Sequence, residues 1–117
     1  MARRVPFSRA VLRYRFTAGS RGADGRWTDS QSAVTVYANI QPASARDREV
    51  LPEGDRQKDA IRYSTADDIR TASQHDQHRA DELEVDGVRY VVMTAAPWRN
   101  VLPHTEGLAL RKAEETP

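Results

Sequence analysis

The chain has 117 residues and a formal net charge of +1, and hydrophobic residues make up 38% of it. This is the length of one ordinary domain, and its modest apolar content predicts a thin core that neighbouring subunits help to complete. The sequence has no apolar run of the roughly 18 residues that a membrane helix needs, no apolar segment behind its basic N-terminus as in a secretory signal, and no cysteine for disulfides or thiolate sites.

Charge is unevenly distributed along the chain. Up to Trp27 there are seven arginines and one acidic residue, whereas the remainder holds eleven basic and sixteen acidic residues. Regions of opposite sign suit head-to-tail contact between copies, or contact with a polyanion at one end. A solvated surface on which charges cluster by chance is the alternative.

Residues 9–16 alternate between two faces and predict a strand that is exposed on one side. We expect the core side to carry Ala10, Leu12, Tyr14 and Phe16. We expect the solvent side to carry Arg9, Val11, Arg13 and Arg15. The glycine-rich stretch 18–25 predicts a turn, and a second alternating strand at 34–41 stops at Pro42. The two strands are expected to form a hairpin.

The stretch 42–81 is polar and too long for an ordinary connection, and such segments are usually functional or disordered. Within it, residues 51–55 predict a turn, Ile61 and Tyr63 fit a short strand, and one helical turn fits residues 64–69. We interpret residues 42–81 as a protruding arm that contacts other molecules.

Residues 82–92 alternate on both sides of Asp86–Gly87, which predicts a hairpin with a two-residue turn. Residues 105–111 fit a last strand, and residues 112–117 are expected to fray. The predicted fold is therefore all-β: a single domain over residues 1–117, forming a small antiparallel β-barrel or sandwich with a long protruding loop and at most one short helix.

No motif in the sequence calls for catalysis. His75 and His78 flank Asp76 as in a metal site, but a spacing of three does not place both rings on one face without a helix, so we expect a solvated loop. Neither a nucleophile elbow nor a phosphate-binding loop is present. We expect no enzymatic activity, no metal and no cofactor.

Three arginines of the first strand are candidates for contact with DNA. Arg9, Arg13 and Arg15 share one predicted face, from which they could meet duplex phosphates without reading bases. The alternative is a solvated basic face behind core aromatics.

Several short motifs between residues 34 and 110 occur in a recognisable order. They are Ile40-Gln41-Pro42, the run Arg48-Glu49-Val50-Leu51-Pro52-Glu53-Gly54-Asp55-Arg56, Ala80-Asp81, the hairpin around Asp86-Gly87, and Trp98. In this order they resemble the small head-completion proteins of tailed bacteriophages, also called stopper, head-closure or collar proteins.

The resemblance implies a virion protein of the phage neck, assembled in the host cytoplasm. Its copies would form a ring of twelve between the portal or adaptor protein and a tail-side protein, and the ring would help to retain packaged double-stranded DNA. On this view the contact element of the arm is formed by Arg48, Leu51, Pro52, Glu53, Gly54, Asp55 and Arg56. A ring interface is heterologous and head-to-tail.

Two other functions remain open. A tail terminator or another head–tail joining component would use the same barrel with different partners. A small β-barrel that binds DNA non-specifically on its own belongs to a different class.

Overall fold

The computed structural model describes residues 5–21, 27–72, 79–98 and 103–112. The predicted glycine-rich turn, His75 and His78, and the last five residues lie outside the described residues. The elements are β1 (Arg9–Arg21), β2 (Trp27–Pro42), α1 (Ala45–Arg48), the 3-10 turn η1 (Glu53–Asp55), β3 (Ala60–Thr65), β4 (Glu82–Val85), β5 (Val88–Val92), β6 (Ala96–Trp98) and β7 (His104–Arg111).

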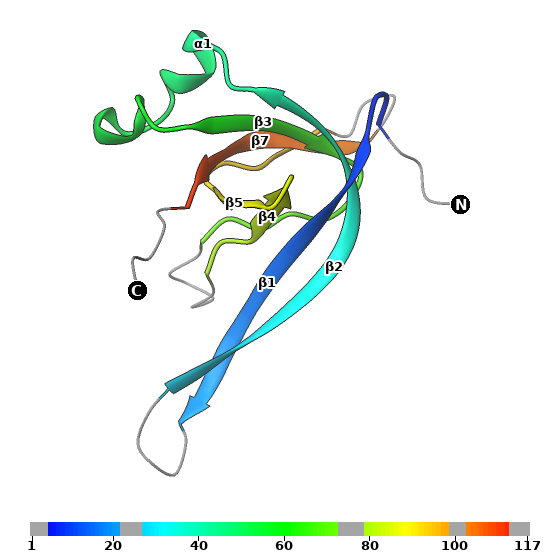
Figure 1. Cartoon of the computed structure of the whole chain (residues 1–117), viewed down its shortest axis with the longest axis vertical. Coiled ribbons are helices and arrows are strands. Elements are labelled where there is room, and N and C mark those ends of the chain that lie inside the picture. Colours follow the sequence, from blue (N-terminus) through cyan, green and yellow to red (C-terminus); the bar gives the residue numbers. More distant parts are fainter. Residues whose placement is uncertain (1–4, 22–26, 73–78, 99–102, 113–117) are drawn as a thin grey trace.

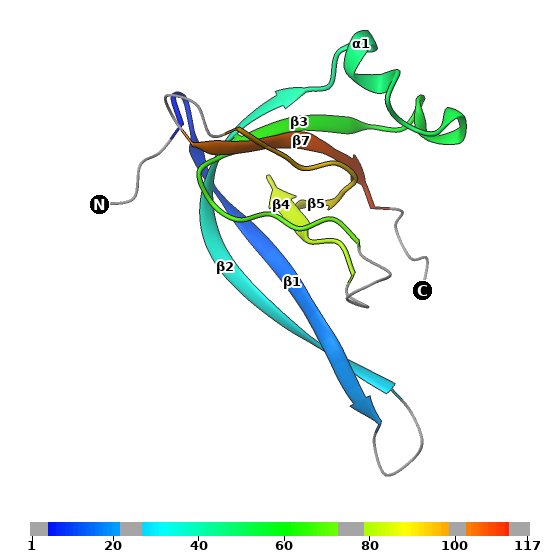
Figure 2. The ribbon, with the colours of Figure 1, turned by 180° about the vertical axis from the view of Figure 1, so that it is seen from behind.

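Six strands close into an antiparallel barrel (Figures 1 and 2). The order around the barrel is β3-β2-β1-β4-β5-β7, and pairing of β3 with β7 completes the circle, with Ala60 opposite Leu110 and Thr65 opposite Thr105. β6 pairs with the first part of β7 as an extra strand. The predicted all-β barrel with at most one short helix is confirmed. The helical turn expected at 64–69 is wrong: β3 continues to Thr65, bends follow it, and the short helix is α1.

The barrel is filled by inward side chains that recur at every second position along its strands, as a pleated strand requires. The largest core cluster joins Val11, Val36, Ala38, Ile61, Tyr63, Ile69, Leu83, Val85, Val92 and Ala109. Ile69 belongs to the connection between β3 and β4, so this connection contributes to the core as well as the strands.

The faces of β1 are the reverse of the expected ones. Val11 lies in the core, and Arg13 pairs with the buried Leu83 of β4, so the arginine-bearing side faces inward. Leu12 and Tyr14 lie on the outer side and are half-buried. Phe16, which was expected on the same side as these two, is buried as predicted. The predicted strand is confirmed, but the long Arg15 side chain reaches the buried Asp81, which a simple apolar count does not anticipate.

The expected arm at residues 42–81 also differs from the structure. Its middle forms β3, which lies between β2 and β7 and buries Ile61 and Tyr63. The element that projects is instead the β1–β2 hairpin, which runs away from the barrel in both views (Figures 1 and 2). The short alternation around Ile61 was enough to make a barrel strand because both neighbouring strands supply apolar partners.

The predicted turn of the β4–β5 hairpin is present. Asp86 and Gly87 both have positive φ, 52° and 81°, as a two-residue turn between twisted strands requires. Beyond β5 the chain bulges, because the amides of Met93 and Thr94 both donate to the carbonyl of Leu108 before β6 begins.

Candidate interaction surface

The projecting hairpin has two edges that pair with no other described strand. β1 pairs with β4 only from Leu12 to Tyr14, and β2 pairs with β3 only from Ala38 onward. Beyond these points the two strands pair with each other alone among the described strands. The free part of β2, Trp27 to Val36, spans roughly 30 Å at the rise of a strand.

The direction of the backbone groups on the free edge of β2 follows from Tyr37. Its amide donates to Asp67 and its carbonyl accepts from the Thr65 hydroxyl, so both groups point away from β1. Backbone direction alternates along an antiparallel strand, so the same groups of Gln31, Ala33 and Thr35 also point outward. No hydrogen bond joins these outward groups to any other described residue.

An ion-pair clamp holds the base of the hairpin. Arg15 donates from Nε and Nη2 to the carboxylate of Asp81, at 3.1 and 2.9 Å, and Asp81 is fully buried. The same carboxylate accepts from the amide of Arg70 at 2.8 Å. The hydrogen bond to Asp81 raises the pKa of Arg15 above its ordinary value. Because both oxygens of the buried Asp81 carboxylate accept hydrogen bonds, the clamp fixes how the hairpin leaves the barrel.

Arg13 extends this clamp to the connection between β3 and β4. Its Nη1 donates to the carbonyl of Asp68 at 2.9 Å, and Arg15 also reaches the carboxylate of Asp68. Arg9 forms an ion pair with Asp86 at the β4–β5 turn. The three arginines predicted to contact DNA therefore all have partners within the chain, and part of the charge difference along the sequence is balanced inside the fold.

A second charged cluster covers the outer face of β1 and β4. Glu82 is 2% exposed and is surrounded by Arg79 at 3.6 Å, Arg89 at 3.4 Å and Lys112 at 3.3 Å. The guanidinium of Arg89 lies 3.6 Å over the Tyr14 ring, and that of Arg79 lies 4.1 Å over the Phe16 ring. Sequence reasoning missed this cluster because its members come from distant segments without a shared motif.

The predicted contact element, Arg48 with residues 51–56, folds onto the barrel. Leu51 is buried against Ala43, Ala60, Leu108 and Leu110.

Arginine side chains then hold the element in shape. Arg48 donates to the carbonyls of Arg56 and Lys58, and Arg56 donates to those of Leu51 and Glu49. Pro52, Glu53 and Gly54 form an exposed tip, Arg56 is also exposed, and Asp55 pairs with Lys58 at 2.7 Å. The exposed tip is thus ordered by its own segment and is accessible from outside.

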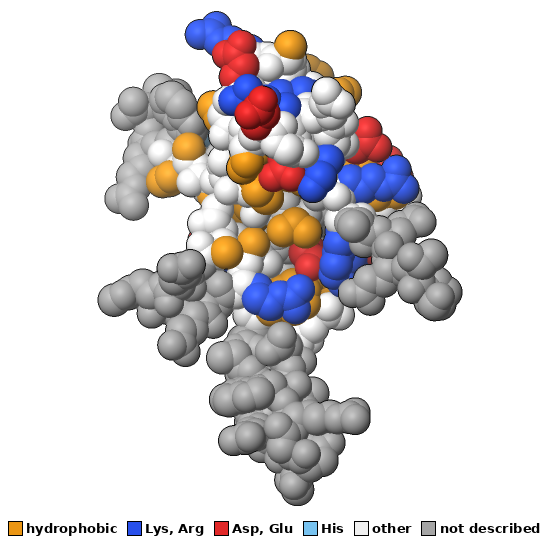
Figure 3. Space-filling model, turned by 90° about the vertical axis from the view of Figure 1, so that its left-hand side faces the viewer, with side chains coloured by type: hydrophobic (Ala, Val, Ile, Leu, Met, Phe, Trp, Pro, Cys, Tyr) orange, Lys and Arg blue, Asp and Glu red, His pale blue; other side chains and the backbone are white. Residues whose placement is uncertain are grey.

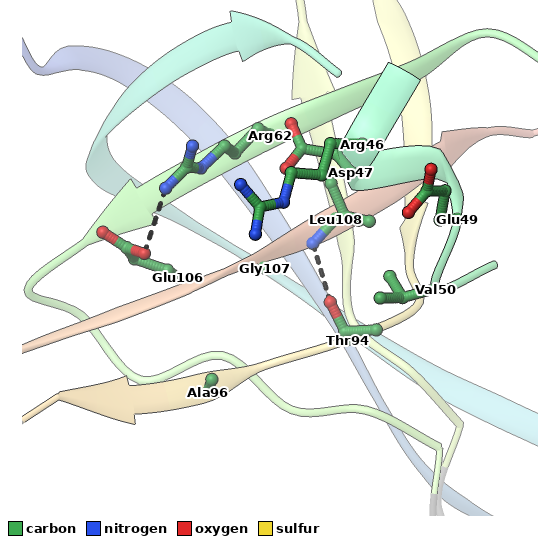
Figure 4. Close-up of a pocket in the computed structure, with 10 residues that line it drawn as sticks. All are labelled: Arg46, Asp47, Glu49, Val50, Arg62, Thr94, Ala96, Glu106, Gly107 and Leu108. Atoms are coloured by element: carbon green, nitrogen blue, oxygen red, sulfur yellow. Dashed lines mark hydrogen bonds and ion pairs between the residues drawn. The ribbon is translucent and has the colours of Figure 1, made fainter. Parts of the chain in front are cut away.

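A groove of about 570 Å³ lies between the barrel wall and the segment formed by α1 with Glu49 and Val50 (Figure 4). α1 contributes Arg46 and Asp47 to one side, and an ion pair between Arg62 and Glu106, 3.3 Å apart, lies on the strands opposite. Hydrogen bonding to the Ser44 amide lowers the pKa of Asp47 below its ordinary value. Val50, which is 69% exposed, lines the groove.

Side chains of opposite charge are interspersed over the side of the molecule that lies to the left in Figure 1. Figure 3 shows basic, acidic and apolar groups alternating among its described side chains. Such a mixed surface fits a protein contact better than the field of a single sign that steers a polyanion.

The described residues hold no group of three or more His, Cys, Asp or Glu side chains that could bind a metal. The described helices include none long and apolar enough to cross a membrane. His104, the histidine within the described part of the chain, lies 3.0 Å from Glu106.

Comparison with known proteins finds no family model that matches the chain. No curated protein matches it either.

Proposed function

We propose that this chain is a structural subunit of the neck of a tailed bacteriophage. Copies of it form a ring between the portal or adaptor protein and the tail, complete the head and help to retain packaged DNA. The role is one of assembly rather than catalysis. The proposal begins from the resemblance of residues 34–110 to head-completion proteins.

The observation that supports it most is the projecting β1–β2 hairpin, whose two edges pair with no other strand in the described part of the chain. Proteins that act as monomers usually shorten, cover or charge their sheet edges, because an open edge invites another strand. A hairpin pair is also marginally stable without further strands. Both facts favour a subunit whose hairpin is completed by another chain.

The compact contact element supports a second interface. Val50 lines a groove on one side of the barrel. The tip at Pro52, Glu53 and Gly54, which follows it in the chain, is exposed. A ring subunit needs contacts on more than one side, because it meets neighbours as well as the layers above and below it. Many weak contacts in a closed ring give tight assembly.

The test is electron microscopy of particles assembled without this protein. Heads that contain or have leaked DNA and carry no tails are expected. Intact heads beside over-long tails would favour a tail terminator instead, and normal particles would overturn a role in the neck.

Binding to DNA by the purified protein distinguishes the third candidate. A salt-dependent gel shift by the isolated chain would favour a DNA-binding barrel that acts alone. No shift at low salt would remove that candidate.

A further inference from the structure

We propose that neighbouring copies join through their hairpins: the free edge of β2 in one copy pairs antiparallel with the free edge of β1 in the next. This inference rests on the proposed function, because it takes the partner to be another copy of the chain in a ring. The pairing extends the sheet from copy to copy along the projecting hairpins.

The first support is that one chain carries both halves of the contact. The outward groups of Gln31, Ala33 and Thr35 lie on one edge of the hairpin, and β1 beyond Tyr14 forms the opposite edge. β1 and β2 run in opposite directions. Hairpins that point the same way therefore place β2 of one copy antiparallel to β1 of its neighbour, which is the pairing geometry of every strand pair in this barrel.

The second support is that the β2 edge lacks the usual features that prevent such pairing. Natural edges are blocked by lysine, proline or inward charges. From Thr28 to Val36 the strand has neither lysine nor proline, and Asp29 is its single charge. Val34, 45% exposed, places an apolar side chain on this free stretch, and a neighbouring strand would cover part of it.

The third support is the clamp at the base of the hairpin. Arg15, Asp81 and the Arg70 amide fix the angle at which the hairpin leaves the barrel. A fixed angle lowers the conformational entropy lost when two hairpins dock. Because each copy uses two different edges, the contact is heterologous and can be repeated around a closed ring.

Cross-linking between single-cysteine variants tests this pairing, since the chain has no native cysteine. Ala33→Cys marks the β2 edge, and Thr17→Cys, Ala18→Cys and Gly19→Cys mark the β1 edge in three registers. Each β1 variant of the full chain is mixed with Ala33→Cys and oxidised over a concentration series that reaches about 1 mM, the range of effective concentration within an assembly. Opposed strands bring Cα atoms within disulfide reach.

We expect at least one mixture to give covalent dimers several-fold above a control mixture of Ala33→Cys with Gln57→Cys, an exposed position away from the hairpin. Failure of all three mixtures to exceed this control overturns the proposal. Ala33→Cys that cross-links to itself as efficiently as the mixtures also overturns it, because that result indicates a twofold β2–β2 contact.

Blocking the edge provides the second measurement. Thr35→Pro in the Ala33→Cys chain removes an outward amide and leaves the groups that pair with β1 intact, so the cross-link should be lost while the thermal transition remains. Undiminished cross-linking overturns the proposal. Thr35→Lys, which keeps the amide and places a charge on the edge, repeats the measurement if the proline variant does not fold.

The outcomes separate this inference from the proposed function. Rings that form without any hairpin cross-link refute the pairing and leave a neck role standing. Normal particles in the absence of the protein refute the neck role, whereas the cross-linking result is read independently of them.

Discussion

The Tyr63 hydroxyl donates a 2.7 Å hydrogen bond to the carbonyl oxygen of Thr94 directly over Gly107. Gly107 pairs with Tyr63 across β3 and β7, and the bulge after β5 brings the Thr94 carbonyl against it. A side chain at residue 107 would occupy the space that this hydrogen bond uses.

Gly107→Ala is therefore expected to destabilise the protein. The added methyl would overlap the Thr94 carbonyl and approach the Tyr63 hydroxyl to 2.6 Å, and overpacking of this kind costs at least about 2 kcal/mol. Urea denaturation gives the difference in unfolding free energy. Gly54→Ala is the control, because its methyl would meet nothing within 4 Å, and equal losses in the two variants would contradict the explanation.

The stability of the protein is expected to fall in alkali because of Tyr63. Burial, with the charge of Asp81 as a second cause, raises the pKa of its phenol above the ordinary value of 10.0. The neutral, buried phenol stabilises the fold fully below the pKa that Tyr63 has in the unfolded chain. This contribution is lost as the pH rises above about 10 toward the higher pKa of Tyr63 in the folded protein. Thermal unfolding at pH 8 and about pH 11 should show a smaller decrease for Tyr63→Phe than for the wild type. A decrease of the same size in both would refute this assignment.

Asp81→Asn is expected to cost about 3 kcal/mol, because it leaves the part-buried Arg15 without its main anionic partner. Asp59→Asn serves as the matched change, since Asp59 is exposed and lies 3.4 Å from Arg111. An exposed pair contributes under about 1 kcal/mol. Equilibrium unfolding of both variants checks the contrast, and a near-neutral Asp81→Asn would show that the clamp does not stabilise the fold.

Removal of the Glu82 charge is expected to destabilise the outer face in a salt-dependent way. Glu82→Gln leaves three cations close together around a buried polar group, at a cost of about 2 kcal/mol. The loss should shrink near 1 M salt, where the Debye length is about 3 Å. Glu84→Gln, in the same strand, is the control because Glu84 has no ion pair among the described side chains. Denaturation at two salt concentrations decides, and a salt-independent loss would contradict the electrostatic cause.

The three β1 arginines should separate into two groups. Arg9→Ala removes an exposed pair with Asp86 and is expected to leave the stability nearly unchanged. Arg13→Ala and Arg15→Ala should lower the melting temperature more, since both hold the β3–β4 connection. If Arg9 meets DNA in the neck, its variant alone should weaken binding without loss of stability. Parallel melting and gel-shift measurements test this.

The barrel could be predicted from the sequence because its signals are local. Alternation in β1 and β2 and the Asp86–Gly87 turn each require only a few adjacent residues, and all of them are present in the structure. The side of β1 that faces inward could not be predicted, because it depends on Asp81, which is 66 residues from Arg15 in the sequence.

The position of the projection was missed for a related reason. Polarity marked residues 42–81, but a strand needs only a few inward side chains when its neighbours supply the rest, as Ile61 and Tyr63 show. The hairpin projects because its partners β4 and β3 are short or begin late along it. The lengths of β3 and β4 therefore decide how far the hairpin projects. The sequence of the hairpin itself contains no information about these lengths.

Closure of the barrel by β3 and β7 sets the order in which the molecule can acquire its shape. Residues 60 and 110 must meet, and such distant pairings form slowly, whereas a hairpin closes within microseconds. During synthesis β1 and β2 are complete well before β7 exists, because β7 begins 62 residues after the end of β2. Nascent chains on one mRNA would then expose hairpins with unpaired strand edges before their barrels are finished. We therefore expect chaperones to be most important for this protein during translation.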